Sequence, residues 1–318
     1  MAPHRDRPAR RVIEFGGVRP AIEIVECGDP EGRQVLFFHG WPMAASQCLV
    51  FEDAARQCGI RLVAASRPGI GRSAPEPVAS VAAWVERVPA LTDALGLERF
   101  GVLGVSGGGP YALATAAAFG ERVQACAVVS CAPPIGHVDR RRLSPWLRTE
   151  LAIRRHAPRL ATVALVAARI VVRRRLFVWA VSARWVGRVP REVEAMRVPA
   201  AAAAFRAARE ALTSPASALA ADADRLAAPW GFVPASVRVP VCFWHGAFDR
   251  TAPWPLVEPV AASIPGARIV VGEADGHHSM SRLRTRDIVG WLSSACPSGP
   301  ARALGPAPSR LASRSAAP

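Results

Sequence analysis

The sequence predicts an α/β fold, and three observations support this prediction. Short apolar runs typical of buried strands alternate with segments of helical pattern from residue 12 to residue 130, and the alternation returns after residue 235. One apolar run, Gly101–Val105, passes through a Gly-rich turn directly into the Ala-rich segment Tyr111–Phe119. The length of 318 residues suits one α/β domain with a core large enough for autonomous stability.

The elements are expected in the following order along the chain. Residues 12–15 and 21–27 are expected to form an opening hairpin. Further strands are expected at Gln34–Phe38, Arg61–Ala65, Arg99–Leu103, Val123–Ser130, Val239–Gly246 and Ala267–Val271, because these runs are apolar and rich in β-branched residues. Helices are expected at Val81–Leu95, at Tyr111–Phe119 and, as the last element, near Thr285–Ser294.

A segment of about 100 residues interrupts this alternation. It is rich in Arg and Ala and mostly helical in pattern, with Pro199 and Pro215 delimiting helices inside it. An insertion of this kind is what a lid over an active site looks like. Both ends of the chain are polar and rich in Pro with Arg, Ser or Ala, which is typical of disorder. The expected division is a core of residues 12–133 and 235–295, a helical lid of residues 134–234, and disordered ends at residues 1–11 and 296–318.

Ser106 lies at the apex of the turn between the strand ending near residue 105 and the helix that follows. A turn this tight needs residues without bulk on both sides, because the backbones of strand and helix approach closely. Gly104 and Gly108 meet that need. The serine hydroxyl is thereby lifted out of the sheet, and backbone N–H groups at the helix N-terminus face any anion that forms beside it. The pattern is typical of a nucleophile elbow, and a Gly-rich turn with an idle serine is the alternative.

An acid and a histidine follow Ser106 in the order that a catalytic set needs. Asp249 comes just after the strand Val239–Gly246, and His277 follows the strand Ala267–Val271. Because the sites of open parallel sheets form at the carboxyl ends of strands, the three side chains are expected to meet at one edge. No residue from 123 through 138 is acidic, so Asp249 has no rival after the preceding strand.

A fourth part of the site is expected in His39-Gly40-Trp41-Pro42, directly after the strand Gln34–Phe38. A tetrahedral oxyanion needs two backbone N–H donors, one of which belongs to the residue after the serine. Gly107 and Trp41 are the natural pair. Pro42 has no N–H to donate, but its ring fixes the loop, and the bond between Trp41 and Pro42 is a candidate for the cis form.

These motifs resemble the α/β-hydrolase fold family, in particular its esterase, epoxide-hydrolase and C–C-hydrolase members. The matching segments are HGWP (39–42), SRPGIGRS (66–73), GVSGGGPYAL (104–113), PVCFWHGAFDRTAP (240–253) and EADGHHS (273–279). The resemblance implies a mostly parallel, eight-stranded twisted sheet flanked by helices, with a helical lid. In such a site Ser106 is the nucleophile, His277 the base and Asp249 its partner, and no metal or organic cofactor is implied.

Two departures from the family pattern affect the expected function. The family often carries Asp at the position of Ser66, so a supporting hydrogen bond in that loop is expected to be altered. Relatives that act on epoxides or haloalkanes carry Asp as the nucleophile, and Ser106 argues against both activities. The leading hypothesis is a serine hydrolase that cleaves a carboxylic ester, or a related acyl or C–C bond, of a small hydrophobic substrate.

Three other functions stay open. The same triad supports a cofactor-free perhydrolase or haloperoxidase-like reaction, or acyl transfer, when peroxide or an alcohol replaces water. A non-catalytic binding protein on the same fold is the second. In the third, the segment Leu151–Trp185 is an amphipathic surface that seeks lipidic substrates, with weak association to a membrane surface.

Several other residues have structural alternatives. His278 is the alternative base, and Asp275 is expected to shape its loop rather than replace Asp249. His39 and His245, at strand ends, are expected to be hydrogen-bonded structural histidines. Within the lid, His137 and His156 are expected to face solvent or to pack against neighbours, and Arg140–Arg142 and Arg173–Arg175 are expected to lie on solvated faces. The aromatic residues of the lid are expected either to line a pocket or to belong to the core: Trp146, Phe177, Trp179, Trp185 and Phe205.

The composition restricts the kinds of binding partner and the cellular compartment that are expected. The formal net charge is +15, but the sequence holds neither Lys nor Asn, which indicates a GC-rich genome rather than a demand for nucleic acid, and no nucleic-acid motif accompanies the charge. The 7 cysteines show no metal spacing. Their odd number and the lack of an apolar signal segment in Met1–Arg11 predict a reducing cytoplasm. The expected oligomeric state is a monomer or a homodimer.

Overall fold

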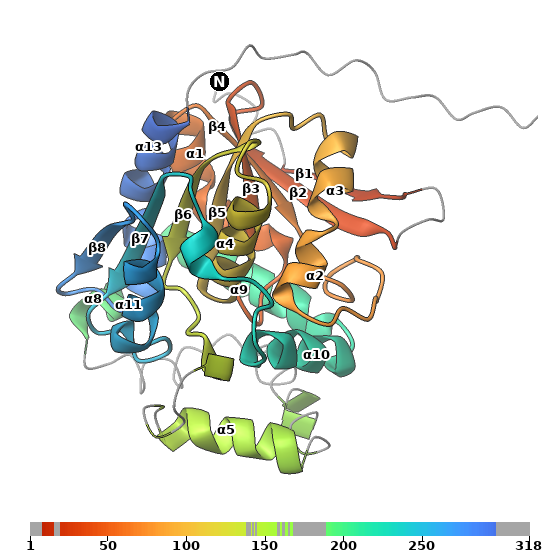
Figure 1. Cartoon of the computed structure of the whole chain (residues 1–318), viewed down its shortest axis with the longest axis vertical. Helices are drawn as coiled ribbons and strands as arrows, with labels where there is room; N and C mark the ends of the chain where they lie inside the picture. The colour runs from red at the N-terminus through yellow and green to blue at the C-terminus, as the bar shows by residue number, and fades with distance from the viewer. Residues whose placement is uncertain are drawn as a thin grey trace, which may run out of the picture.

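The computed structural model describes residues 8–15, 20–137, 141, 143, 145–157, 160, 163, 164, 166, 167 and 189–296. Within these residues, a single 8-stranded sheet runs in the order β1-β2-β4-β3-β5-β6-β7-β8 (Figure 1). The strands are β1 (Ala9–Ile13), β2 (Ile22–Gly28), β3 (Arg33–Phe38), β4 (Ile60–Ala65), β5 (Phe100–Val105), β6 (Val123–Val129), β7 (Val241–Gly246) and β8 (Arg268–Gly272). Only β2 pairs antiparallel with its neighbours, β1 and β4, and the other pairs are parallel. The predicted α/β fold with a mostly parallel sheet is confirmed.

Helices cover both faces of the sheet (Figure 1). They are α1 (Glu52–Gln57), α2 (Val81–Val85), α3 (Val88–Ala94), α4 (Gly109–Ala118), α5 (Pro145–His156), α8 (Pro190–Ala195), α9 (Pro199–Thr213), α10 (Ala216–Ala227), α11 (Trp254–Ser263), α12 (His277–Leu283) and α13 (Thr285–Ala295), with short 3-10 turns η1 (Ala45–Phe51), η2 (Ser106–Gly108), η3 (Ile135–His137) and η5 (Pro234–Ser236). Because successive side chains of a strand point to opposite faces, Phe38 belongs to the core on the side of α2, α3, α4 and α11, whereas Phe37 belongs to the core on the side of α1 and α13. Burial of both faces explains why the central strands are almost continuously apolar.

Both chain ends depart from the predicted boundaries. The disordered N-terminus expected at residues 1–11 is wrong for Ala9–Arg11, which form most of β1. Ion pairs hold this strand: Arg10 contacts Glu23 at 2.9 Å, and Arg11 contacts Glu26 at 2.7 Å. At the other end, the tail expected at 296–318 is wrong for Cys296, which is buried in the core beside α13. Residues 1–7 and 297–318 lie outside the described part of the chain.

The single helix predicted at Val81–Leu95 is also wrong, because the structure divides it into α2 and α3. Pro89 occupies the first turn of α3. A proline there has no N–H for the preceding turn, and its ring would collide with the carbonyl of Val85 in a continuous helix. The chain therefore bends at residues 86 and 87 and starts again.

The described parts of the 134–234 segment are helical, as predicted. Helix α9 begins at Pro199, and Pro215 is the N-cap of α10, so both prolines delimit helices. In Figure 1, α5, α9 and α10 lie in the lower part of the view. The described helices include none that is both long and apolar enough to cross a bilayer. Most of Leu151–Trp185 lies outside the described residues, and the role of the segment as a lid stays a prediction.

Candidate active site

Ser106 occupies a strained turn between β5 and α4. Its φ of 53° lies in the left-handed region, which non-glycine residues rarely adopt. The neighbouring backbones are in close contact. A methyl group on Gly104 would lie 2.5 Å from the carbonyl oxygen of Gly108, and one on Gly108 would collide with the carbonyl of Phe38. Strand, turn and helix therefore approach as the elbow pattern predicts.

Asp249 and His277 form a directed pair at the carboxyl ends of β7 and β8. Asp249 Oδ1 accepts hydrogen bonds from the backbone N–H groups of Thr251 (2.9 Å) and Ala252 (2.7 Å). Its Oδ2 lies 2.7 Å from His277 Nδ1. A carboxylate accepts only, so Nδ1 carries the proton and donates it, which leaves Nε2 unprotonated. The His277 ring is therefore oriented with its basic nitrogen away from Asp249.

The environment of His277 favours its protonated form. Burial lowers the pKa of the imidazole, but the charge of Asp249 and the hydrogen bond to it raise the pKa more, so that it lies above the ordinary value of 6.5. Glu192 on α8 adds to this increase. The His277 side chain stays 12% exposed.

The segment after β6 brings the loops of Ser106 and His277 together. The N–H of Ala132 donates to the carbonyl of Ser106 (2.9 Å), and the hydroxyl of Ser130 donates to the carbonyl of His277 (3.2 Å). The hydrogen bonds recorded among the described residues include none between Ser106 Oγ and the His277 ring. The structure thus joins Asp249 to His277 directly, and Ser106 to them through a shared neighbour.

The alternatives to His277 and Asp249 have other partners. The His278 ring meets the His277 ring edge to face, with centroids 5.4 Å apart. Burial, followed by the charges of Arg282 and His277, lowers the pKa of His278 well below its ordinary value. Asp275 is buried between Arg191 Nε (2.7 Å) and Arg284 Nη2 (3.1 Å), so its carboxylate holds its own loop.

Two further histidines are hydrogen-bonded inside the core, as expected. His245 Nε2 lies 2.7 Å from the carbonyl of Ala252, and it is 3.4 Å from Asp249 Oδ2. His39 Nε2 accepts from the N–H of Arg67 (3.1 Å), and Nδ1 lies 2.9 Å from the carbonyl of Gly40. Burial, with the nearby Arg67 charge, lowers the pKa of His39 to about 3, so this ring is neutral.

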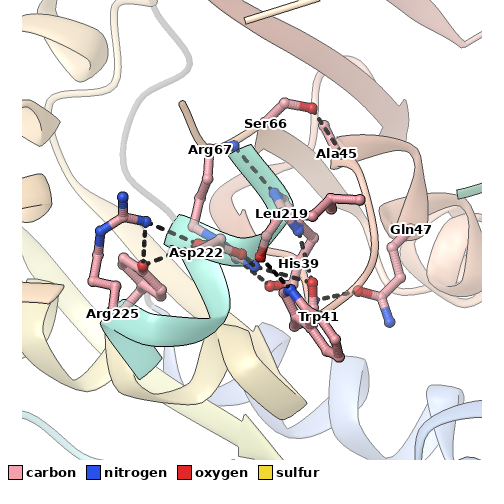
Figure 2. Close-up of polar contacts among 11 residues, drawn as sticks. His39, Trp41, Ala45, Gln47, Ser66, Arg67, Leu219, Asp222 and Arg225 are labelled. Carbon is pink, nitrogen blue, oxygen red and sulfur yellow. Dashed lines mark hydrogen bonds and ion pairs between the residues drawn. The ribbon is translucent and has the colours of Figure 1, made fainter. Parts of the chain in front are cut away.

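The expected oxyanion donors lie side by side. A methyl group on Gly107 would come within 3.2 Å of the Trp41 nitrogen, which puts the two backbone amides next to one another. The peptide bond between Trp41 and Pro42 is cis. Gln47 Oε1 accepts from the N–H of Gly40 (2.6 Å), and the Trp41 indole donates to the carbonyl of Leu219 on α10 (3.0 Å), as Figure 2 shows.

Ser66 has a carboxylate partner that the sequence reasoning missed. Its hydroxyl accepts from the N–H of Ala45 (3.0 Å) and donates to Oε2 of Glu23 on β2 (2.9 Å). The same oxygen of Glu23 accepts from the N–H of Arg72 at 3.1 Å. The signal was present, because Glu23 lies between Ile22 and Ile24 in a mostly apolar strand. A carboxylate therefore reaches this loop from a neighbouring strand.

Other contacts at the site also lay outside the prediction. Glu192, buried on α8, accepts from the N–H of Ser279 at 2.6 Å and so holds the start of α12, which carries His277. Arg67 pairs with Asp222 on α10. The sequence gives no local signal for either contact, because the partners are 87 and 155 residues apart.

The structure describes only some of the lid residues whose roles were predicted from the sequence. Phe205 is half-buried, and His156 and Arg141 are exposed. The side chains of Trp146 and His137, and all of Phe177, Trp179, Trp185, Arg140, Arg142 and Arg173–Arg175, lie outside the described residues. All of Cys27, Cys48, Cys58, Cys126, Cys131, Cys242 and Cys296 are free.

A mostly parallel sheet with a serine elbow near its middle is the architecture of the α/β hydrolases. The family described as alpha/beta hydrolase fold matches residues 34–281, and the chain belongs to this family. Among solved structures it is similar to a thermophilic esterase from Thermogutta terrifontis (20% identity, TM-score 0.62, 92% of this chain and 100% of that one). It is also similar to the enol-lactonase from Burkholderia xenovorans (18% identity, TM-score 0.65, 90% and 99%).

A non-heme chloroperoxidase from Streptomyces lividans is 37% identical over 116 residues. This match covers 35% of the present chain and 41% of the chloroperoxidase, so the chain matches less than half of that relative. The protein is an α/β hydrolase with esterase, lactonase and haloperoxidase neighbours.

Proposed function

We propose that the protein is a serine hydrolase that cleaves a carboxylic ester of a small hydrophobic substrate. The observation that carries this proposal is the pair of Asp249 and His277, in which a fully hydrogen-bonded carboxylate fixes the imidazole tautomer. The strained turn at Ser106 supplies a hydroxyl at the same edge of the sheet. The esterase and enol-lactonase among the structural neighbours act on the same class of bond, and this supports the proposal.

In the proposed reaction, Ser106 Oγ attacks the ester carbonyl carbon while its proton passes to His277 Nε2. Asp249 stabilises the imidazolium that forms. The carbonyl oxygen becomes an oxyanion and accepts hydrogen bonds from the N–H groups of Trp41 and Gly107. Collapse of this intermediate breaks the bond to the alcohol, which leaves with the proton from His277. A water molecule then gives a proton to His277 and attacks the acyl group, releasing the carboxylic acid and restoring Ser106.

This mechanism needs a hydrogen bond from Ser106 Oγ to His277 Nε2. Such bonds are often long or poorly aligned without substrate and tighten in the Michaelis complex. Rotation of the serine side chain about χ1 changes the direction of its hydroxyl without moving the turn.

The test is hydrolysis of p-nitrophenyl esters of graded chain length by wild type and Ser106→Ala. Loss of the nucleophile is expected to lower kcat by roughly 10⁴-fold or more. The matched control is Ser294→Ala, an exposed serine on α13 whose hydroxyl donates to the carbonyl of Trp291. The control should keep the wild-type rate. A fluorophosphonate probe should label wild type and the control but not Ser106→Ala. Unchanged activity in Ser106→Ala would refute the proposal.

The second candidate function keeps this site but changes the acyl acceptor. The similarity to a non-heme chloroperoxidase supports a perhydrolase reaction, in which hydrogen peroxide replaces water and the acyl-enzyme yields a peracid. The two functions are separated by supplying peroxide or an alcohol during turnover and measuring how acyl groups divide between acid, peracid and ester. A non-catalytic binding protein would have no activated nucleophile at this site. Labelling of Ser106 by the probe would therefore argue against that function.

A further inference from the structure

A buried ion pair joins α10 to the loop after β4. Arg67 and Asp222 have side chains that are each 1% exposed. Two parallel hydrogen bonds connect them, from Arg67 Nε to Oδ1 (2.8 Å) and from Nη2 to Oδ2 (2.7 Å), as Figure 2 shows. Bidentate geometry of this kind fixes the plane of the guanidinium as well as its position.

The other donors of Arg67 hold the loop that contains Trp41. Nη1 donates to the carbonyl of His39 (2.5 Å), and Nη2 donates to the carbonyl of Gly40 (3.0 Å). The backbone N–H of Arg67 donates to the His39 ring. Arg67 thus binds two successive carbonyls directly before Trp41, while Asp222 sets the angle from which it does so.

The geometry of one peptide unit links this contact to the candidate oxyanion site. The Gly40 carbonyl and the Trp41 N–H belong to the same planar unit, which is trans, so they point in opposite directions. When Arg67 holds the Gly40 carbonyl on one side, the Trp41 N–H is aimed to the other side. That side faces the elbow: a methyl group on Gly107 would contact the Trp41 nitrogen, and one on Gly40 would lie 3.2 Å from Ser106 Cβ.

The charges around Asp222 keep it ionised. Burial raises the pKa of its carboxyl, but the charge and hydrogen bond of Arg67, together with the charge of Arg225, lower it more, so that the pKa lies below its ordinary value. Arg225 Nη1 donates to Oδ1 at 3.0 Å, and the Tyr111 hydroxyl donates to the same oxygen at 3.4 Å. Helix α10 also accepts the Trp41 indole N–H at Leu219, and its Leu226 side chain packs on Gly107.

We propose that Asp222 is a positioning residue for the hydrolase reaction, because through Arg67 it aims the Trp41 N–H at the oxyanion that forms beside Ser106. Helix α10 then contributes to stabilisation of the transition state. This inference rests on the proposed function. It differs from a purely structural role, in which the ion pair only anchors α10 and affects folding but not the reaction.

The test is the isosteric variant Asp222→Asn, which removes the charge and one of the two acceptors for Arg67. Misdirection of one oxyanion donor should lower kcat by roughly tenfold to a hundredfold, below the 10²–10³ cost of losing such a donor completely. KM for a p-nitrophenyl ester should change by less than about threefold, because the ground state does not use this hydrogen bond. The affinity for a boronic acid that mimics the tetrahedral intermediate should fall in parallel with kcat.

A matched control breaks another largely buried ion pair, which joins β4 to β2. Glu26→Gln removes the partner of Arg61, with side chains 13% and 9% exposed. This variant should keep the wild-type kcat and boronic acid affinity at equal folded fraction. Asp222→Asn with wild-type kcat and wild-type affinity for the boronic acid, whatever its melting temperature, would overturn the inference. Equal losses in both variants would also overturn it, because they would indicate a general effect of stability.

Two additions keep the result decisive. If Asp222→Asn does not fold, the triple variant Arg67→Met/Asp222→Leu/Arg225→Met removes all three buried charges of this cluster, an exchange that is often neutral or stabilising. A folded triple variant with wild-type kcat overturns the inference, and a low kcat supports it. Amide hydrogen exchange over residues 40–44 does not depend on activity. If wild type fails to react with the fluorophosphonate, the proposed function fails. Faster exchange in Asp222→Asn then still supports control of the loop by Asp222, and unchanged exchange refutes it.

Discussion

The contacts of Asp249 allow the effect of Asp249→Asn to be worked out. Two backbone N–H groups point at Oδ1, so the amide oxygen of the variant must occupy that place. The amide NH₂ then faces His277 Nδ1 and donates to it, which forces the imidazole proton onto Nε2. In this tautomer His277 has no lone pair for the proton of Ser106. In serine proteases the same substitution, which gives the wrong imidazole tautomer, lowers kcat by roughly 10⁴-fold. This corresponds to about 5.4 kcal/mol of transition-state stabilisation.

The assay is kcat/KM for a p-nitrophenyl ester near pH 8, with the folded fraction measured by circular dichroism. The matched control is Asp275→Asn, which changes a buried carboxylate that lies near His277 but contacts Arg191 and Arg284 instead. It should lower the melting temperature while kcat/KM per folded molecule stays within about fivefold of wild type. If Asp249→Asn kept its activity within tenfold and Asp275→Asn lost it, Asp275 would be the acid and the assignment would fail.

Three further predictions follow from the same contacts. His277 must be neutral to act as the base, and its pKa is raised, so kcat/KM should fall as the pH is lowered, with a midpoint above 6.5. Asp249→Asn should lower that midpoint in a pH profile of both proteins, and a wild-type midpoint below 6.5 would contradict this. His278→Gln should keep the activity within about threefold, whereas His277→Gln should lose it, and the reverse result in the ester assay would make His278 the base. Gly108→Ala should unfold or strongly destabilise the protein, because the new methyl group would collide with the carbonyl of Phe38. In Gly290→Ala on α13 the methyl group meets nothing within 4 Å, so this variant should be more stable by about 0.5–1 kcal/mol in chemical denaturation. Equal effects of the two substitutions would refute the close approach at the elbow.

Local chemistry was enough to predict much of the fold. The strands were visible because β3 to β7 are mostly buried on both faces and therefore mostly apolar. Ser106 and Asp249 were visible because each directly follows such a strand. The orientation of Asp249 toward His277 was inferred from residue order alone, and the 2.7 Å contact between them agrees with it.

The remaining features depend on contacts that have no local pattern. The break between α2 and α3 comes from Pro89, and the helical pattern of the residues on both sides led to the prediction of one continuous helix. Strand β1 begins at Ala9 because Arg10 and Arg11 find acidic partners on β2, which a polar N-terminal composition does not indicate. Asp222 lies in an Ala-rich amphipathic helix, where an acid suggests an exposed face. Only the folded chain brings it to Arg67 in the interior.

The exchange at Ser66 has a consequence for how such proteins are compared. The acid that relatives often carry in that loop is absent at this position of the chain, yet Glu23 delivers a carboxylate there from β2. A comparison of sequences alone would register Ser66 in place of the acid but not the carboxylate that Glu23 places beside it. Only a comparison in three dimensions would show that this loop has a carboxylate from another part of the sequence, and a search pattern that demands aspartate before Arg67 would overlook this protein.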